Sequence, residues 1–182
     1  MPLNQFVTKI VKVENTLTFG FYGRSSQGVK TATRIFSKAC FMSDFYVQSF
    51  VFTGGRGLKR GFVKIDKNPI LSKQVEDPDF YLVFDPTLDM NAKSFKDSSI
   101  VLFNSPEKMV FTQLKKHKIK TYFVDATEIA LTHMKANMPS TAMLGALAKL
   151  FNKISMKNIK AAMEDMQKEN FAAFDEGYKN VR

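Results

Sequence analysis

A turn bounded by two glycines, Gly23-Arg-Ser-Ser-Gln-Gly28, is the segment of this chain whose residue types best suit the binding of a ligand. It lies between a predicted strand over 16–22 and a predicted helix that begins at Val29. The N-terminus of a helix presents unpaired N–H groups and a partial positive charge, so it attracts phosphates and carboxylates. Glycine lets a backbone turn sharply and approach a ligand, and arginine adds a cation with paired donors. The candidate ligand-binding residues of the turn are Gly23, Arg24, Ser25, Ser26, Gln27 and Gly28.

The same residues could also serve only the fold. Ser25 or Ser26 could act as the N-cap of the helix, and Gly28 could allow the helix to pack on a strand. The spacing of the glycines matches neither the Walker A loop nor the Gly-x-Gly-x-x-Gly fingerprint of dinucleotide-binding proteins. The residues of the turn therefore leave ligand binding and helix capping as open alternatives.

A second loop, Gly54–Gly61, is rich in glycine and in cations. It separates predicted strands over 45–52 and 62–66, and so short a connection predicts an antiparallel, hairpin-like excursion. The three cations of the loop are Arg56, Lys59 and Arg60. We count the two arginines as candidate ligand-binding residues, because the loop could lie beside the first turn and close over an anionic group. The alternative is an exposed hairpin tip with no ligand.

Conventional catalytic and metal-binding sets are missing from the sequence. His117 and His133 have no Cys, Asp or Glu partner at the spacing of metal ligands, so both are expected to be structural or solvated. The single cysteine, Cys40, falls on the apolar side of the helix that follows the turn, where a thiol packs and does not react. We therefore predict no catalytic residue and no metal site in this chain.

Strand and helix patterns alternate along the chain. Strands are predicted over 16–22, 45–52, 62–66, 80–84, 99–103 and 122–124, and helices over 29–43, 106–114, 125–134, 140–150, 155–166 and 171–178. The order predicts a single α/β domain over 1–182, a three-layer α/β/α arrangement whose mixed sheet is mostly parallel and has one hairpin-like excursion. Residues 1–15 are expected to be an extension or an extra strand.

Composition and charge restrict the environment and the partners. No apolar run approaches the roughly 20 residues of a membrane span, and one cysteine suits a reducing compartment, so we expect a cytoplasmic protein. The net charge of +10 favours an anionic partner: a phosphorylated cofactor, an acidic protein or nucleic acid. Nucleic acid has the weakest support, because most aromatic residues fall within predicted strands. The basic run Lys115–Lys120 is either a solvated helix end or an anion-binding patch.

The segment Gly23-Arg-Ser-Ser-Gln-Gly-Val-Lys-Thr-Ala32 resembles the signature Gly-Arg-Gly-Gly-Gln-Gly-Val-x-Thr-Ala of the gamma subunits of pyruvate-type 2-oxoacid:ferredoxin oxidoreductases. Later segments are similar to this family in the same order, and the resemblance covers nearly the whole chain from Thr16. These segments are Tyr46-Val-Gln-Ser-Phe50, Lys67-Asn-Pro-Ile70, Asp77-Pro-Asp79, Phe84-Asp-Pro-Thr-Leu88, Asp125-Ala-Thr-Glu-Ile-Ala130, Ser140-Thr-Ala-Met-Leu-Gly-Ala-Leu-Ala-Lys149 and Asn170-Phe-Ala-Ala-Phe-Asp-Glu-Gly-Tyr178.

The resemblance implies a role as one subunit of a larger enzyme. Enzymes of this family decarboxylate a 2-oxoacid on thiamine diphosphate, pass two electrons through iron–sulfur clusters to ferredoxin, and form acyl-coenzyme A. Thiamine diphosphate and the clusters lie mainly on the other subunits, so no cofactor is expected on this chain alone. The expected partners are the thiamine-binding and ferredoxin-like subunits, ferredoxin and coenzyme A, to which this chain would contribute a scaffold and contacts on the coenzyme A side.

Two departures from the family pattern affect the candidate site. Ser25 and Ser26 replace the two central glycines of the signature. In the second loop, Arg56-Gly57 is the preferred match to the Arg-Gly of the family, and Arg60-Gly61 is the alternative. These changes leave a second hypothesis open, a divergent paralogue that acts as a stand-alone or regulatory module for an anionic ligand such as a nucleotide or coenzyme A.

Overall fold

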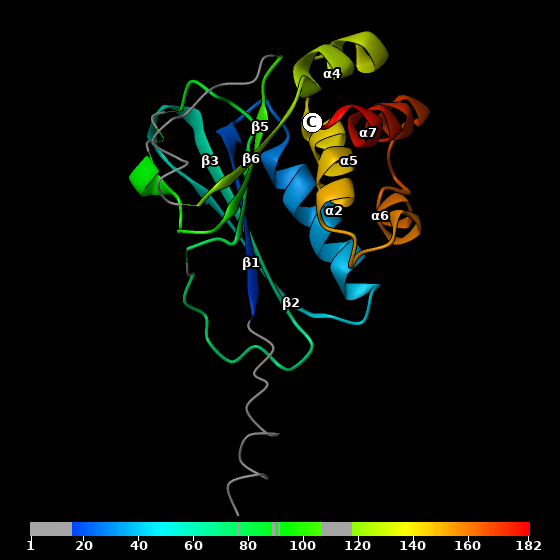
Figure 1. Ribbon diagram of the computed structural model, residues 1–182. Coiled ribbons are helices and arrows are strands. Elements are labelled where there is room, and N and C mark those ends of the chain that lie inside the picture. Colours follow the sequence, from blue (N-terminus) through cyan, green and yellow to red (C-terminus); the bar gives the residue numbers. More distant parts are fainter. Residues whose placement is uncertain (1–15, 76, 89, 91, 107–117) are drawn as a thin grey trace, which may run out of the picture.

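Six strands form one mixed sheet in the order β2-β3-β1-β4-β5-β6 in the computed structural model, which describes residues 16–75, 77–88, 90, 92–106 and 118–182 (Figure 1). The strands are β1 (Leu17–Arg24), β2 (Tyr46–Thr53), β3 (Leu58–Asp66), β4 (Phe80–Val83), β5 (Ile100–Asn104) and β6 (Lys120–Val124). The helices are α2 (Val29–Phe41), α4 (Ala126–Met134), α5 (Ser140–Leu150), α6 (Met156–Ala162) and α7 (Lys168–Asn180), with 3-10 turns η1 (Gly55–Gly57) and η2 (Ala92–Ser94).

The sheet confirms the predicted α/β class and the predicted hairpin. β2 pairs with β3, and β3 pairs with β1, in antiparallel register, whereas β1, β4, β5 and β6 run parallel to one another. All six predicted strands are present, and β3 begins at Leu58, earlier than predicted. The hairpin therefore forms one half of the sheet, and the parallel strands form the other.

Two predicted helix starts are confirmed by their caps. The Asp125 carboxylate accepts the N–H of Glu128 at 3.0 Å, and the Ser155 hydroxyl accepts the N–H of Asn158 at 3.1 Å. Such caps satisfy N–H groups that have no partner within the helix. The helix predicted over 106–114 lies, apart from its first residue, outside the described residues, as do residues 115–117 of the basic run 115–120.

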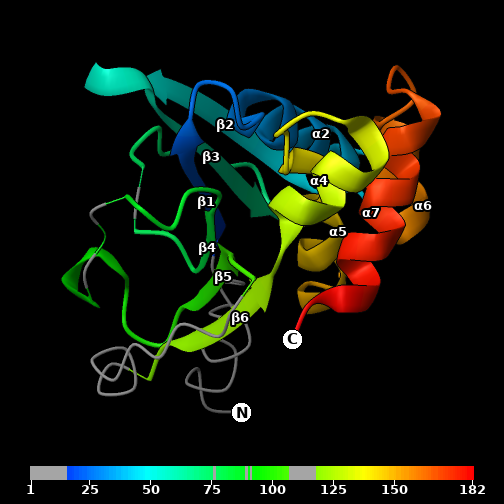
Figure 2. The same cartoon turned by 90° about the horizontal axis from the view of Figure 1, so that it is seen from above.

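The two faces of the sheet differ in what covers them. All the described α-helices lie on one face, which we call the α2 face (Figures 1 and 2). The other face packs against the connection from β4 to β5, where the ring of Phe95 contacts those of Tyr81 and Phe103; we call it the Phe95 face. Within the described residues, the layer on this second face is thus a loop with η2, and the main core lies under the helices.

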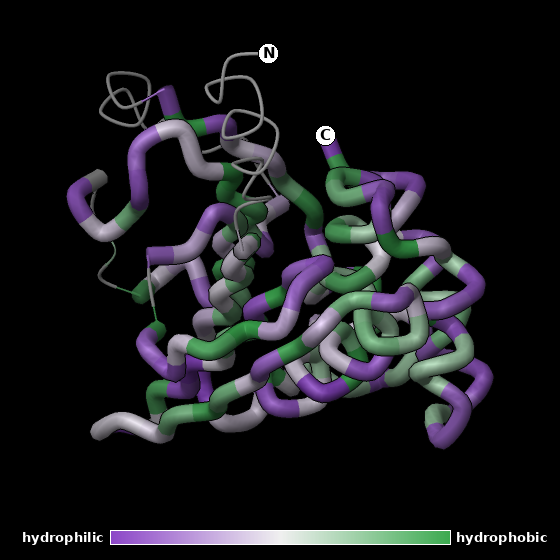
Figure 3. The backbone as a smooth tube through the Cα atoms, turned by 90° about the horizontal axis from the view of Figure 1, so that it is seen from below, coloured by the Kyte–Doolittle hydropathy of each residue, from purple (hydrophilic) through white to green (hydrophobic). Residues whose placement is uncertain are grey.

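Helix α2 illustrates how the sequence pattern produces the core. Its apolar residues recur at helical spacing, and Ile35, Phe36 and Cys40 are buried against the sheet. Figure 3 shows hydrophilic and hydrophobic residues alternating along the helices, as expected for helices with one buried side. Cys40 is buried, as predicted, and burial raises the pKa of its thiol. No helix among the described residues combines the length and the apolar character that a membrane span requires.

Helices α5 and α7 approach each other through two glycines. A Cβ atom on Gly145 would lie 1.9 Å from the carbonyl oxygen of Phe174, and one on Gly177 would lie 2.1 Å from that of Ala142. Neither distance is possible for a real side chain, so the contact requires glycine on both helices. This close packing fixes the outer helices on the α2 face and, through α4, the end of β6.

Candidate functional site

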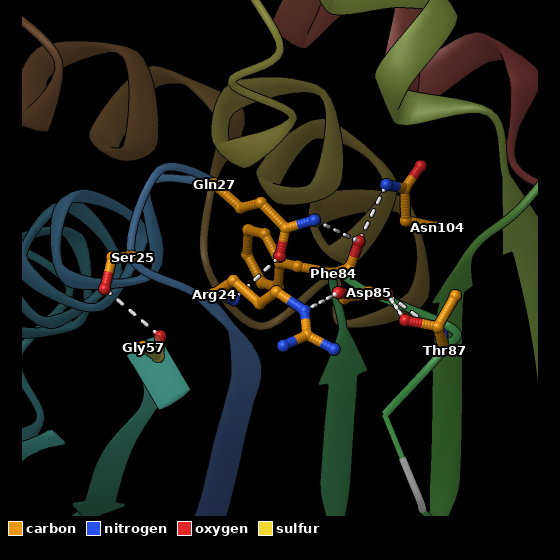
Figure 4. A network of polar contacts seen from close by, with 8 residues as sticks. All are labelled: Arg24, Ser25, Gln27, Gly57, Phe84, Asp85, Thr87 and Asn104. Atoms are coloured by element: carbon orange, nitrogen blue, oxygen red, sulfur yellow. Dashed lines mark hydrogen bonds and ion pairs between the residues drawn. The ribbon is translucent and has the colours of Figure 1, made fainter. Parts of the chain in front are cut away.

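The turn Gly23–Gly28 lies at the carboxyl end of β1, next to the carboxyl end of β4 (Figure 4). From β1 the chain enters α2 on one face of the sheet, whereas from β4 it enters the η2 segment on the Phe95 face. In open α/β sheets, neighbouring parallel strands whose connections leave to opposite faces form a crevice at their carboxyl ends, and ligands bind there. The predicted turn therefore occupies the position at which this class of fold binds ligands.

Gln27 closes the turn with its own side chain. Its Oε1 accepts the N–H of Arg24 at 2.8 Å, and its backbone N–H donates to the Arg24 carbonyl at 3.1 Å. Its Nε2 donates to the Phe84 carbonyl at 3.5 Å, which ties the turn to the end of β4. Both ends of the amide are therefore used within the chain. Gln27 thus shapes the turn, and its place among the ligand-binding residues stays a prediction.

The two glycines of the turn are required for different reasons. Gly28 has φ of +77°, a conformation that favours glycine, and a Cβ there would lie 2.6 Å from the Ser140 hydroxyl at the start of α5. A Cβ on Gly23 would lie 2.9 Å from the Phe84 side chain. Gly28 thus allows α2 to pack closely on α5. The alternative in which the turn serves only the fold had predicted that Gly28 packs on a strand.

The two serines do not cap α2. The N-cap residue is Gly28, and no side chain there bonds to the helix, so the capping alternative is wrong. The Ser25 hydroxyl instead donates to the Gly57 carbonyl in η1 at 3.1 Å, and Ser26 is exposed. Because Ser25 reaches across to the second loop, the two predicted segments lie side by side, as the sequence suggested (Figure 4).

Arg24 is held by a buried carboxylate that lies just after β4. Its Nε lies 2.6 Å from Oδ2 of Asp85, whose side chain is 10% exposed against 46% for that of Arg24. The Thr87 hydroxyl and backbone N–H donate to the other carboxylate oxygen at 2.6 and 2.9 Å. Burial alone would raise the pKa of Asp85, but the hydrogen bonds from Thr87 and Arg24 outweigh it and hold the pKa below its ordinary value. The carboxylate is therefore charged at neutral pH, and it orients the guanidinium.

The outer nitrogens of Arg24 point away from this carboxylate (Figure 4). Only the Nε of the guanidinium bonds to Asp85, and the two Nη atoms have no bond to any described residue. A guanidinium in this state presents two parallel donors, the geometry that suits a phosphate or a carboxylate. A guanidinium held in this way can bind and orient an anion.

Arg56 and Arg60 lie on the hairpin side of the turn. Arg56 is exposed in η1 with φ of +54°, and Arg60 is exposed on β3 opposite Tyr22. Arg60 contributes to a cavity of about 450 Å³. Its lining residues are Tyr22, Leu58, Arg60, Leu88, Met90 and Ser94. Burial raises the pKa of Tyr22, so its hydroxyl stays protonated at neutral pH. A cavity with both polar and apolar walls, to which Arg60 contributes a cation, thus lies beside the end of β1 that carries Arg24.

The polar residues at the strand ends were not predicted from the sequence as members of the site. Asn104, at the end of β5, donates to the Phe84 carbonyl and to the Thr127 hydroxyl, both at 2.8 Å, and it accepts the Thr127 N–H at 3.1 Å. It thereby joins the ends of β4 and β5 to the start of α4. The sequence did contain a signal for these residues. Asp85 directly follows the apolar run 80–84, and Asn104 follows the apolar run 100–103.

The structure describes one of the two histidines. His133 bonds to Glu176 of α7, which makes it structural, as expected, and His117 is outside the described residues. Among the residues that the structure describes, no group of three His, Cys, Asp or Glu side chains is placed to hold a metal ion.

Comparison with known proteins places the chain in a family. The model of the family described as pyruvate ferredoxin/flavodoxin oxidoreductase matches residues 18–180. The chain belongs to this family. It is 36% identical over 178 residues to the common gamma subunit of the pyruvate/ketoisovalerate oxidoreductases of Pyrococcus furiosus, a match that covers 88% of this chain and 95% of the relative. The predicted resemblance to the gamma subunit is thus confirmed.

Two solved structures share the fold. A crystal structure of the pyruvate oxidoreductase subunit PorC from Thermotoga maritima matches with a TM-score of 0.78 and 29% identity, covering 92% of this chain and 97% of that one. A 2-oxoglutarate:ferredoxin oxidoreductase from Magnetococcus marinus matches with a TM-score of 0.73 and 18% identity. The match covers 90% of this chain but 30% of the Magnetococcus chain, so the same fold there is one part of a longer polypeptide.

Proposed function

We propose that this family member works as the gamma subunit of a multi-subunit 2-oxoacid:ferredoxin oxidoreductase, with pyruvate as the expected 2-oxoacid. The complex would convert the 2-oxoacid and coenzyme A to acyl-coenzyme A and carbon dioxide, with two electrons passed to ferredoxin. The proposal is supported by the near full-length match to gamma subunits named for pyruvate and ketoisovalerate oxidoreductases. We place thiamine diphosphate and the iron–sulfur clusters on partner subunits, and the complex in the cytoplasm.

This chain would supply a scaffold and the contacts to the anionic part of coenzyme A. The observation that carries this assignment is the Arg24–Asp85 pair, which leaves both Nη atoms of Arg24 facing the crevice. Coenzyme A carries phosphate groups, and a guanidinium fork binds phosphate through two donors. Arg56 and Arg60 add positive charge on the hairpin side, where Ser25 fixes the loop beside the turn.

Steady-state kinetics of the reconstituted complex test the assignment. The complex should lose activity without this chain, and Arg24→Gln should raise the KM for coenzyme A about 10-fold, the equivalent of one charge-assisted contact of about 1.4 kcal/mol. The KM for the 2-oxoacid should stay unchanged. Arg34→Gln is the matched control, because Arg34 is an exposed arginine of α2 that pairs with Asp165, away from the crevice.

Two results would contradict this role. Full activity of the partner subunits without the chain would exclude an enzymatic contribution, and an unchanged KM in Arg24→Gln would exclude the anion contact. The double substitution Ser25→Gly and Ser26→Gly restores the family signature and tests the turn itself. If the serines limit the approach of the ligand, this variant should lower the KM for coenzyme A.

A further inference from the structure

Strand β2 is an outer strand of the sheet, and no described segment covers its free edge (Figure 2). Its eight residues, Tyr46-Val-Gln-Ser-Phe-Val-Phe-Thr53, include no charge and no proline. Three large side chains are exposed, Tyr46 by 52%, Val51 by 41% and Phe52 by 49%. Natural proteins protect edge strands with charges, prolines, bulges or covering segments, because an open edge pairs with other chains. β2 has a continuous register with β3 and shows none of these devices among the described residues.

The hydrogen-bond pattern shows which backbone groups are open. The Gly54 N–H donates to the Leu58 carbonyl at 2.8 Å, so Thr53 and Lys59 between them form a pair without mutual hydrogen bonds. Because such pairs alternate with bonded pairs along an antiparallel ladder, every second residue of β2 turns its N–H and C=O away from β3. These residues are Val47, Ser49, Val51 and Thr53. No described residue supplies a partner for their outward groups.

We propose that β2 pairs with β2 of a second copy of this chain, antiparallel and about a two-fold axis at Phe50. In this register Val47 faces Thr53 of the second copy, and Ser49 faces Val51. All four outward-facing residues of each copy then bond to the other copy, and Phe50 faces Phe50 as a non-hydrogen-bonded pair. Such an interface uses the same surface on both copies and closes on itself.

The residues along the edge suit a second copy. Self-pairing opposes each residue to one of the same strand, and an uncharged strand therefore brings no like charges together. Beyond the strand, the same register sets the exposed Asp44 of one copy at the end where the exposed Arg56 of the other lies. The rings of Phe50 and Phe52 stack at 6.5 Å on the Phe95 face, so pairing gathers four rings about the axis.

The mass of the full-length chain in solution tests the proposal. Light scattering during size-exclusion chromatography should give twice the chain mass of 20.7 kDa. Because the net charge of +10 makes the copies repel, added salt should strengthen the dimer. Val51→Pro removes an outward N–H without removing a bond to β3, so it should give a folded monomer. Val51→Thr keeps the N–H and should remain dimeric. A monomeric wild-type chain would overturn the proposal, whether or not partner subunits bind the strand.

A cysteine crosslink tests the register. Facing residues of a non-hydrogen-bonded pair have Cα atoms about 4.5 Å apart, which is within the range of a disulfide. Phe50→Cys should therefore form a disulfide-linked dimer under mild oxidation, and the native Cys40 does not interfere because it is buried. Thr53→Cys is the matched control, since Thr53 lies at the exposed end of the strand, far from the axis, and should not crosslink. Equal crosslinking of both variants would exclude this register.

Discussion

At the carboxyl ends of β4 and β5, polar side chains are buried and bonded within the chain, whereas at the hairpin end of β2 and β3 they are exposed. Asp85 accepts from Arg24 and Thr87, and Asn104 joins two strands to α4. Across the turn, Arg56 is exposed and has no partner among the described residues. The hydrogen bonds of Asp85 and Asn104 in the parallel half thus fix the geometry of the crevice. The antiparallel half exposes Arg56, Arg60, the rings of Tyr46 and Phe52, and an outer strand edge.

The two halves should differ most in the stability that they lose when a glycine is replaced by alanine. Gly145→Ala should lower the free energy of unfolding by about 3 kcal/mol or more, or prevent folding, because its Cβ would collide with the Phe174 carbonyl. Gly55→Ala in the hairpin loop meets open space and should change the stability by less than about 0.5 kcal/mol. Urea denaturation measures both. Similar losses in the two variants would remove the contrast between a packed half and an open half.

A smaller loss of stability is expected when the buried carboxylate of Asp85 is removed from the parallel half. Asp85→Ala should cost about 2 kcal/mol at neutral pH, because it leaves the donors of Arg24 and Thr87 without their acceptor. The folded pKa of Asp85 is lowered, so its contribution is complete above the unfolded pKa of about 3.9. It is lost as the pH falls through the folded pKa. Urea denaturation should therefore show that the difference in free energy of unfolding between wild type and Asp85→Ala becomes smaller below about pH 4. A difference that becomes larger there would contradict this role of Asp85.

The hairpin half has one buried charge, and removing it should loosen the loop that it holds. The Nζ of the buried Lys64 donates to the Ser72 and Gln74 carbonyls at 3.0 and 2.9 Å. Lys64→Met should cost about 1 kcal/mol and speed thermolysin cleavage beside the exposed Leu71. The exposed Lys73 is the matched control, and Lys73→Met should leave both stability and cleavage unchanged. Equal cleavage of the two variants would show that Lys64 does not hold this segment.

The smallest effect is expected for an exposed ion pair. Arg34 and Asp165 lie 3.9 Å apart, and both side chains are mostly exposed. Asp165→Ala should therefore change the free energy of unfolding by less than about 0.5 kcal/mol, since water and salt screen such pairs. Comparison with Asp85→Ala separates the effect of burial from that of charge. A loss as large as that of Asp85→Ala would contradict the comparison.

The sequence alone determined the elements and their connections. Alternating and helical periodicities report burial over short distances, and they placed the strands, the hairpin and most of the helices close to their observed bounds. Local hydrogen bonding between near neighbours was equally accessible, as the caps at Asp125 and Ser155 show. The signature from Gly23 to Ala32 and the segments that follow it also identified the family.

Only the tertiary structure decided how the residues of the turn are used. Arg24 meets Asp85, Ser25 meets Gly57, and Gly28 meets Ser140, and each pair is distant in the sequence. These contacts depend on β4 lying beside β1 and on the hairpin returning along its other edge, an order that periodicity does not encode. Residue type showed that the turn could attract an anion. The strand order brought Asp85 to Arg24, and this buried carboxylate orients the guanidinium.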